Sequence, residues 1–247
     1  MSKRLVRKVT VVEKTQLSPH FIRMKLAGDD LKSFPAEQES GYIKLRFPSD
    51  NPEKPILRTY TIRAFDPTTS ELTVDFVAHG DNGPASKWAG EAAVGDSIEI
   101  NGPGDKKLVD FSADCFLLVG DMTALPAISV NLEQLPDDAV GYAVLEVVAE
   151  EDKLALKKPA GVEICWVINP HPTQPNSCLY DAVVELPWQE GRLSAWVACE
   201  FDQMRAIRGY LRNDKGLDRS SLYASSYWKI GTSDEGNKAA KKLDTDA

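Results

Sequence analysis

The sequence predicts a two-domain protein, with an antiparallel β domain followed by an α/β domain. The chain has 247 residues, which exceeds the usual single-domain length of about 100–150 residues. Hydrophobic residues make up 43% and charged residues 27%, a balance typical of packed globular proteins. The period of the apolar residues changes near residue 105. We therefore expect a first domain over residues 1–105, a second over 106–232 and a tail over 233–247.

Six short alternating or β-branched segments predict six strands in the first domain. In chain order they read LVRKVTVVEKT, FIRMKLAG, YIKLRF, RTYTIRAF, ELTVDFVAH and DSIEING. Turn residues separate them, and this spacing is typical of an antiparallel barrel or sandwich. One short helix interrupts the strands and begins at Gly83-Pro84, because proline suits the first helical position.

Apolar segments alternate with helical ones in the second domain. The apolar segments include CFLLVG, AVLEVVA, VEICWVI, LSAWVAC and YASSYWKIG, and the helical ones include LPAISVNLEQL and FDQMRAIRGYLRN. Such alternation predicts a mostly parallel sheet covered by helices. The tail after Thr232 contains small or charged residues, so we expect it to be either frayed or a short docked helix.

Charge and cysteine usage narrow the class of protein. Lys and Arg number 29 against 37 Asp and Glu, and the formal net charge of −8 argues against a nucleic-acid partner. Three histidines without a Cys-x-x-Cys pair do not favour a metal site. We expect four free, buried and reduced thiols, at Cys115, Cys165, Cys178 and Cys199. The chain shows neither a signal-peptide segment nor an apolar run of about 18 residues, so we expect a cytoplasmic protein with no membrane partner.

The segment RTYTIR at residues 58–63 is the first candidate for a ligand site. Strand alternation puts Arg58 and Tyr60 on one face, roughly 6.6 Å apart. A guanidinium there can hold a phosphate while the phenol ring covers a flat ligand. Thr61 points the other way and offers a hydroxyl and a backbone amide. The same pattern also fits an ordinary solvated strand face.

The start of the short helix, Gly83-Pro84-Ala85-Ser86, is the second candidate. Unsatisfied amides at a helix N-terminus bind anions such as a pyrophosphate. The alternative is a Gly-Pro cap in which Ser86 has only a structural role. His79, before this helix, is by itself more typical of a hydrogen-bonded structural histidine than of a catalyst, and we expect Trp88 in the core.

Four motifs together resemble the siderophore-interacting protein family, the ferric-siderophore reductases of the ferredoxin-reductase-like flavoproteins. They are RTYTIR at 58–63, DFVAHGDNGPASKWA at 75–89, GDMTALPAI at 120–128 and YWKIG at 227–231. They occur in the family's order, and the resemblance spans nearly the whole chain. It implies a flavin-binding barrel followed by a ferredoxin-reductase-like α/β domain. It also implies non-covalent FAD and reduction of Fe(III)-siderophores in the cytoplasm.

The resemblance also implies roles for individual residues. Arg58 would bind the pyrophosphate of FAD, Tyr60 would contact the flavin ring, and Thr61 would bond to its reactive nitrogen. The other flavin contacts it implies are Thr59, Val77, His79, Gly83, Ala85, Ser86, Asp121, Thr123 and Trp228. No protein nucleophile or general acid is needed, because the cofactor carries the chemistry.

An anionic ferric siderophore requires local cations on a protein of net charge −8. The resemblance places Lys44, on the YIKLRF strand, toward the substrate cleft. Arg63 is a candidate because it follows the flavin motif, and Lys229 is one because it follows the Tyr-Trp pair. Each of the three also fits an ordinary surface charge.

The electron donor is open between NAD(P)H and a ferredoxin. Residues 120–123, GDMT, supply one glycine where a dinucleotide fingerprint supplies three. Cys199 stands where the family commonly has glycine, and so does Ser226. These differences argue against a nicotinamide site, and we expect Cys199 to be a buried, inert thiol.

Arg205, Arg208 and Arg212 recur on one face of the last predicted helix, and Arg219 follows shortly after. This stripe fits a docking patch for an acidic ferredoxin, a site for a nicotinamide 2′-phosphate, or an ordinary solvated face.

We expect a monomeric FAD-dependent ferric-siderophore reductase that releases Fe(II). Siderophores use hard oxygen donors that favour Fe(III), so reduction weakens their hold on the metal. One alternative is a general NAD(P)H-dependent flavin reductase. The other is a siderophore-binding module whose flavin is structural.

Overall fold

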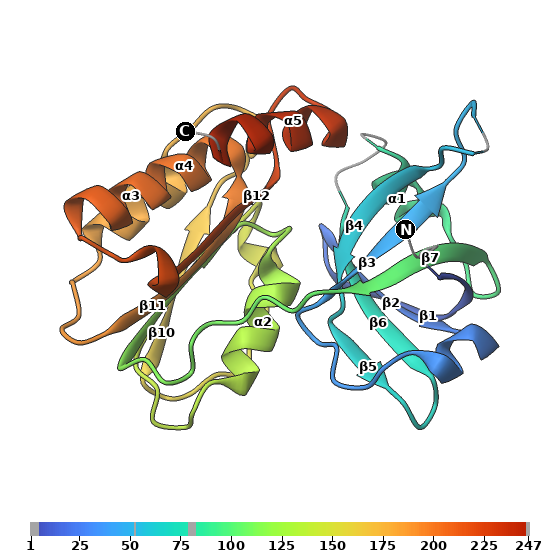
Figure 1. The fold of residues 1–247 in the computed structure, drawn as a ribbon, viewed down its shortest axis with the longest axis horizontal. Helices are drawn as coiled ribbons and strands as arrows, with labels where there is room; N and C mark the ends of the chain where they lie inside the picture. Colours follow the sequence, from blue (N-terminus) through green and yellow to red (C-terminus); the bar gives the residue numbers. More distant parts are fainter. Residues whose placement is uncertain (1–4, 52, 79–82, 246–247) are drawn as a thin grey trace. The chain divides into compact units, whose positions relative to one another are not determined.

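The computed structural model describes residues 5–51, 53–78 and 83–245 (Figure 1). The chain divides into two compact units, with the division between Lys107 and Leu108. Each unit has its own sheet.

An antiparallel sheet forms the first unit, and its described residues make seven strands. They are β1 (Val6–Ser18), β2 (Phe21–Ala27), β3 (Tyr42–Phe47), β4 (Ile56–Thr61), β5 (Ala64–Asp66), β6 (Glu71–Val77) and β7 (Ser97–Gly104). Their spatial order is β4-β3-β7-β1-β2-β6-β5. A 3-10 helix over Asp29–Ser33 follows β2, and helix α1 (Pro84–Glu91) precedes β7. The predicted antiparallel barrel-like domain is therefore confirmed.

The prediction of six strands was wrong by one, because the segment RTYTIRAF contains both β4 and β5. At the break, the Ile62 amide donates to the Gly41 carbonyl at 2.8 Å, and the Arg63 amide donates to the Thr73 carbonyl at 3.0 Å. Strand β4 is thus one edge of the sheet, paired with β3, and β5 is the other edge, paired with β6. The chain passes directly from one edge strand to the other. This corner brings the sheet edges together and gives the sheet its barrel-like form.

Alternation within β3 separates the core from the outer face of the first sheet. Ile43 and Leu45 are fully buried, whereas Lys44 and Arg46 lie on the opposite face. Tyr42 packs over Gly104 of β7, where a Cβ atom would lie only 2.0 Å from the tyrosine ring. A glycine is therefore required at residue 104.

The second unit is built on a parallel sheet with five strands in the described chain. The strands are β8 (Cys115–Gly120), β9 (Gly141–Val147), β10 (Val162–Ile168), β11 (Leu193–Glu200) and β12 (Leu222–Trp228). Their order is β10-β9-β8-β11-β12, with parallel pairing throughout. Every residue of β8 and β11 is buried, as expected for central strands covered on both faces. The predicted mostly parallel sheet is confirmed.

Helices α2 (Leu125–Gln134), α3 (Cys178–Glu185), α4 (Phe201–Gly209) and α5 (Asp234–Thr245) accompany this sheet (Figure 1). A π-helical turn over Tyr210–Asp214 continues α4, and short 3-10 turns cover Glu150–Asp152 and Arg219–Ser221. Helix α5 is the docked alternative that the sequence left open for the tail, because it packs on β12.

All four cysteines are free, as predicted. Cys115 and Cys199 are buried, but Cys165 is only partly buried and Cys178 is exposed at the first position of α3. The prediction of four buried thiols was therefore wrong for these two. Among the described residues, no helix has the length and apolar character needed to cross a membrane. The same residues contain no metal-binding group of His, Cys, Asp and Glu side chains.

Candidate functional site

Arg58 and Tyr60 share the core-facing side of strand β4. Arg58 lies opposite Leu45 and Tyr60 lies opposite Ile43, and both partners are fully buried. Residues opposite each other in an antiparallel pair share a face of the sheet. Thr59 and Thr61 therefore lie on the outer face with Lys44 and Tyr42, their partners in β3.

An aromatic row connects Tyr60 to helix α1. The Tyr60 and Phe76 ring centroids are 4.5 Å apart, Phe76 and Trp88 are 5.8 Å apart, and Trp88 and Phe47 are 6.4 Å apart. Shielding from water raises the pKa of the Tyr60 phenol. Trp88 packs against the hydrophobic core, as predicted. The sequence analysis did not predict Phe76 as part of the site. Strand alternation could have shown that it faces inward, because it follows the buried Leu72 and Val74 at every second position.

Helix α1, which contributes Trp88 to this row, begins just after Gly83. Gly83 has φ 154°, in the range that favours glycine, and a Cβ built there would meet no described atom within 4 Å. Ala85 and Ser86, in the first turn, are buried. The Lys87 amide makes a helical hydrogen bond to the Gly83 carbonyl, so the amides before it point out of the helix end. The backbone here suits close approach by an anion.

These features fit the groups that FAD presents. A diphosphate needs a cation and backbone amides, which Arg58 and the α1 N-terminus offer. A flat ring system needs an aromatic wall, which Tyr60 offers with Phe76 behind it. Val77 alternates with Phe76, so its side chain lies on the other face of β6, opposite Phe21. His79 lies outside the described residues.

The second unit brings three other predicted residues together, with Asp121 at the centre. One carboxylate oxygen accepts from the Thr123 amide at 2.9 Å and from its hydroxyl at 2.5 Å. The other accepts from the Trp228 indole Nε1 at 2.7 Å. Burial raises the pKa of Asp121, and these hydrogen bonds oppose that rise. Asp121, Thr123 and Trp228 therefore form one hydrogen-bonded group.

Gly120, just before this group, is required by helix packing. A Cβ there would lie 2.7 Å from Ile128 Cδ1, 2.8 Å from Ala124 Cβ and 2.8 Å from the Ala198 carbonyl oxygen. The glycine thus allows α2 to lie close to β8 and β11. The structure assigns a packing role to the one glycine that the GDMT segment has.

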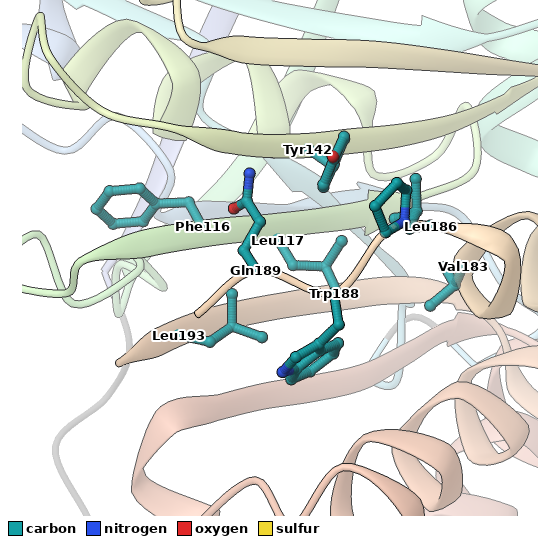
Figure 2. Close-up of a pocket in the computed structure, with 9 residues that line it drawn as sticks. Phe116, Leu117, Tyr142, Val183, Leu186, Trp188, Gln189 and Leu193 are labelled. Carbon is teal, nitrogen blue, oxygen red and sulfur yellow. The ribbon is translucent and has the colours of Figure 1, made fainter. Parts of the chain in front are cut away.

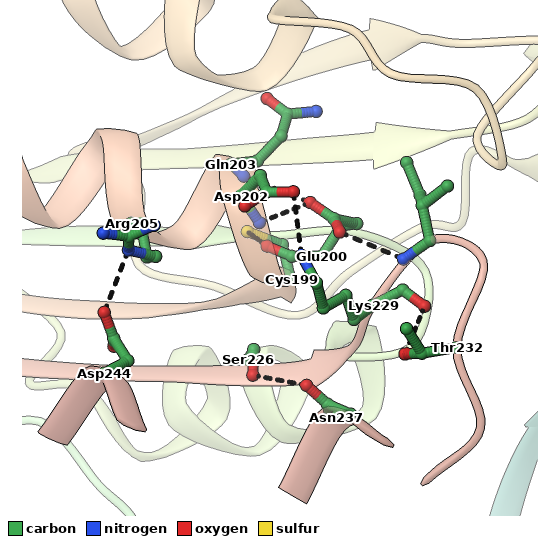
Figure 3. A network of polar contacts seen from close by, with 11 residues as sticks. Cys199, Glu200, Asp202, Gln203, Arg205, Ser226, Lys229, Thr232, Asn237 and Asp244 are labelled. Atoms are coloured by element: carbon green, nitrogen blue, oxygen red, sulfur yellow. Dashed lines mark hydrogen bonds and ion pairs between the residues drawn. The ribbon is translucent and has the colours of Figure 1, made fainter. Parts of the chain in front are cut away.

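Two further carboxyl groups lie on the strands beside Asp121. Glu200 ends β11 and caps α4, accepting from the Asp202 amide at 2.6 Å and from the Ile230 amide at 3.1 Å (Figure 3). Burial, together with the charge of Asp121, raises the pKa of Glu146 in β9 to about 7. All three carboxyl groups are buried. Burial also raises the pKa of the Cys199 thiol, which is the expected inert state.

The carboxyl ends of β8 and β11 flank the point where the strand order reverses. Open α/β sheets bind dinucleotides at this point. Here it carries buried acidic groups in place of a glycine-rich loop, and a pyrophosphate would meet negative charge. The sequence analysis did not predict Glu146 as a site residue, because the sequence around a single polar residue in an apolar strand does not show which side chains surround it.

The three predicted substrate cations have different environments. Lys44 Nζ lies 5.9 Å from the centre of the Tyr42 ring on the outer face of β3. Arg63 is partly buried at the corner between β4 and β5. Lys229 Nζ forms an ion pair with Asp202 at 3.0 Å (Figure 3). It also lies 4.3 Å from the Phe201 ring centre. An anionic substrate would compete with Asp202 for Lys229.

Two arginines of the stripe on α4 pair with a carboxylate of helix α5. Arg208 binds both carboxylate oxygens of Asp244 in α5, at 2.6 and 2.7 Å. Arg205 Nε binds the same carboxylate at 2.9 Å. The sequence left a docking patch, a 2′-phosphate site and a solvated face open for this stripe. In the structure both arginines pair with the C-terminal helix, and Arg205 also stays half exposed.

Residues 113–231 match the family model described as siderophore-interacting protein. Residues 10–55 and 50–107 match the siderophore-interacting FAD-binding domain. The chain belongs to the siderophore-interacting protein family. The predicted family and the predicted cofactor, FAD, are confirmed.

Individual relatives cover almost the whole chain. Ferric vibriobactin reductase ViuB of Vibrio cholerae is 36% identical, over 91% of this chain and 89% of that protein. The structure of the siderophore-interacting protein SipS from Aeromonas hydrophila aligns with a TM-score of 0.87 at 35% identity, over 99% of both chains. A siderophore utilization protein from T. fusca aligns with a TM-score of 0.82 at 30% identity, over 93% of this chain and 94% of that one.

A separate small apolar hollow, open to solvent, lies near the amino ends of the parallel strands (Figure 2). Its lining residues are Phe116, Leu117, Tyr142, Val183, Leu186, Pro187, Trp188, Gln189 and Leu193. None of the predicted site residues is among them. The family's motifs lie elsewhere, so we do not place the reaction in this hollow.

Proposed function

We propose that this protein is an FAD-dependent ferric-siderophore reductase that acts as a monomer in the cytoplasm and releases Fe(II). The observation that carries this proposal is the aromatic row. It joins Tyr60, on the face of β4 that holds Arg58, to helix α1, at whose start no described atom lies within 4 Å of a Cβ built at Gly83. The relationship to a ferric vibriobactin reductase supports the same activity.

Arg58 would make charge-assisted hydrogen bonds to the FAD diphosphate, with the amides of Ala85 and Ser86 as further donors. Tyr60 would lie against the flavin ring, and Thr59 and Thr61 would supply polar contacts from the same strand. In the second unit, Asp121, Thr123 and Trp228 are proposed to contact the flavin as one group. Bound FAD would supply the electrons.

The substrate is an Fe(III) complex with hard oxygen ligands. Each ferric ion takes up one electron and becomes Fe(II), which such ligands hold more weakly. The protein's part is to bring the complex near the flavin, and Lys44, Arg63 and Lys229 are the proposed cations. At an effective dielectric near 20, a cation about 4 Å from a unit negative charge gains up to about 4 kcal/mol before desolvation.

A ferredoxin-type protein is the proposed electron donor. The packing role of Gly120 and the buried carboxyl groups of Asp121, Glu146 and Glu200 speak against a dinucleotide at the reversal of strand order. The same observation disfavours a general NAD(P)H-dependent flavin reductase. Four free thiols agree with a reducing compartment.

The test is an anaerobic titration of the FAD-loaded protein, followed by its flavin absorbance. Reduced ferredoxin is expected to bleach the flavin faster than NADH or NADPH at equal concentration. Addition of a ferric siderophore should then restore the oxidised spectrum, with Fe(II) captured by a ferrous chelator. Rapid NAD(P)H oxidation without siderophore would identify a general flavin reductase. Siderophore binding without flavin reoxidation would identify a binding module.

A further inference from the structure

Four arginines gather where α4 ends. Arg205 and Arg208 lie on α4, Arg212 lies in the π-helical turn that continues it, and Arg219 begins the next 3-10 turn. Arg205 and Arg208 both bond to Asp244, and burial together with the charges of Arg208 and Arg219 lowers the pKa of Arg212. We call these four residues the arginine cluster. Its charge stands out on a chain of net charge −8.

Asp244 of helix α5 is held inside this cluster. Arg208 grips its carboxylate with two parallel hydrogen bonds, and Arg205 adds a third (Figure 3 shows the Arg205 contact). The Asp244 side chain is only 8% exposed. Proteins use this forked geometry to bind carboxylate and phosphate groups. Asp244 therefore occupies a formed anion site.

The single negative charge of Asp244 does not neutralise the positive charge of the arginine cluster. Arg208 and Arg219 act on Arg212 as like charges, and the opposing acidic group is Asp244. In the described part of the chain, Arg212 Nε is buried and has no hydrogen-bond partner. A buried donor of this kind costs free energy until an acceptor reaches it. A group with more charge and more oxygens than one carboxylate, such as a phosphate, fits this surplus.

Polar contacts hold α5 in place. The Ser226 hydroxyl bonds to Asn237 at 2.9 Å, and Lys241 Nζ donates to the Ser225 hydroxyl at 2.8 Å and to the Ser226 carbonyl at 3.0 Å (Figure 3 shows the first contact). Leu243 of the same helix is 73% exposed. Release of α5 therefore exchanges these polar contacts for contacts with water and uncovers Ser226 and Asn237, which are 1% and 3% exposed.

We propose that the arginine cluster is a binding site for a phosphate group, and that α5 is its built-in competitor through Asp244. A phosphate that engages Arg205, Arg208 and Arg212 displaces Asp244 and releases α5 from β12. The effect reaches the Trp228 end of β12, because α5 is bonded to Ser225 and Ser226 in the same strand. The proposal does not depend on whether the protein reduces ferric siderophores.

The test uses the full-length FAD-loaded protein, inorganic phosphate as the probe, and sodium chloride at matched ionic strength as the reference. Hydrogen exchange of the α5 amides is expected to accelerate several-fold more with phosphate than with chloride. Calorimetry with Asp244→Asn should show phosphate binding about tenfold tighter, as expected if α5 occupies the wild-type site about nine-tenths of the time. Flavin absorbance checks that FAD stays bound.

Arg208→Gln should abolish phosphate binding and release α5 without any ligand. Arg192→Gln is the matched control, because it removes an exposed arginine paired with Asp110 at the amino end of β11. It should leave both readouts unchanged. If Arg208→Gln fails to fold, Asp244→Asn alone decides the question. The proposal is overturned if that variant binds phosphate no tighter than the wild type, or if phosphate and chloride act equally on α5.

Two further ligands distinguish the source of the phosphate. Tighter binding of adenosine monophosphate than of inorganic phosphate would identify an organic phosphate ester as the natural ligand class. The reverse order would identify free phosphate, and both orders support the site. A short polyglutamate peptide that displaces α5 where neither phosphate compound does would overturn the proposal in favour of an acidic protein partner.

Discussion

The Trp228 indole donates a 2.7 Å hydrogen bond to the Asp121 carboxylate, across a separation of 107 residues in the sequence. Asp121 is buried, and its second oxygen is held by Thr123. A buried carboxylate that loses a donor loses more free energy than the bond alone contributes. The bond therefore fixes the Trp228 side chain with respect to the end of β8.

Replacement of Trp228 by phenylalanine is expected to lower the free energy of unfolding by about 1–3 kcal/mol, because one buried oxygen of Asp121 then loses its indole donor. Urea unfolding of the FAD-loaded protein measures this change. Trp188→Phe is the control, since Trp188 is 43% exposed. It should change the unfolding free energy by less than about 0.5 kcal/mol. Equal losses of unfolding free energy in the two variants would show that the hydrogen bond to Asp121 does not stabilise the fold.

Arg58→Ala is expected to weaken FAD binding by at least about tenfold and leave the fold intact, because a charge-assisted phosphate contact contributes about 1.5–3 kcal/mol. Flavin absorbance after gel filtration and a titration of the apoprotein measure the loss, and circular dichroism reports the fold. Arg46→Ala is the matched control on the neighbouring strand, where Arg46 pairs with Glu99 at 3.1 Å. If both variants keep their FAD, Arg58 is not a cofactor ligand.

Lys44→Glu is expected to raise the KM for an anionic ferric catecholate about tenfold, because an attraction becomes a repulsion at the outer face of β3. A near-neutral ferric hydroxamate should show a much smaller change, and FAD content should stay constant. Lys32→Glu is the control, since Lys32 is exposed and pairs with Asp29. Equal effects of Lys44→Glu on both siderophores would contradict a role in reading substrate charge.

Stability should depend on pH through Glu146, whose pKa is raised from 4.5 to about 7. The folded state then binds a proton more tightly than the unfolded state, so this group's favourable contribution is present below about pH 4.5 and is lost as the pH rises to about 7. The loss amounts to at most about 3 kcal/mol.

Glu146→Gln removes this titration, so the variant should be more stable than the wild type at pH 8 and should gain little at pH 5. Urea unfolding at both values measures the difference. Glu163→Gln, on the neighbouring strand β10, is the control because Glu163 is exposed. A pH profile of Glu146→Gln that parallels the wild type would assign the titration to another group.

Local pattern was enough to predict several parts of the site. Alternation in a strand is a property of the backbone, so Arg58 and Tyr60 share a face whatever the strand packs against. The change of period near residue 105 predicted an antiparallel sheet followed by a parallel one, because each sheet type buries its side chains in a different pattern. The four motifs indicated the family and FAD.

Contacts between distant parts of the chain could be seen only in the tertiary structure. The bonds of Trp228 to Asp121 and of Arg208 to Asp244 depend on which strands and helices become neighbours, and local pattern carries no record of that order. The packing role of Gly120 and the raised pKa of Glu146 arise from side chains on other elements. Sequence determined which residues each strand and helix presents. Tertiary packing decided which of those residues meet, because burial and hydrogen bonding act between atoms that are close in space, whatever their separation along the chain.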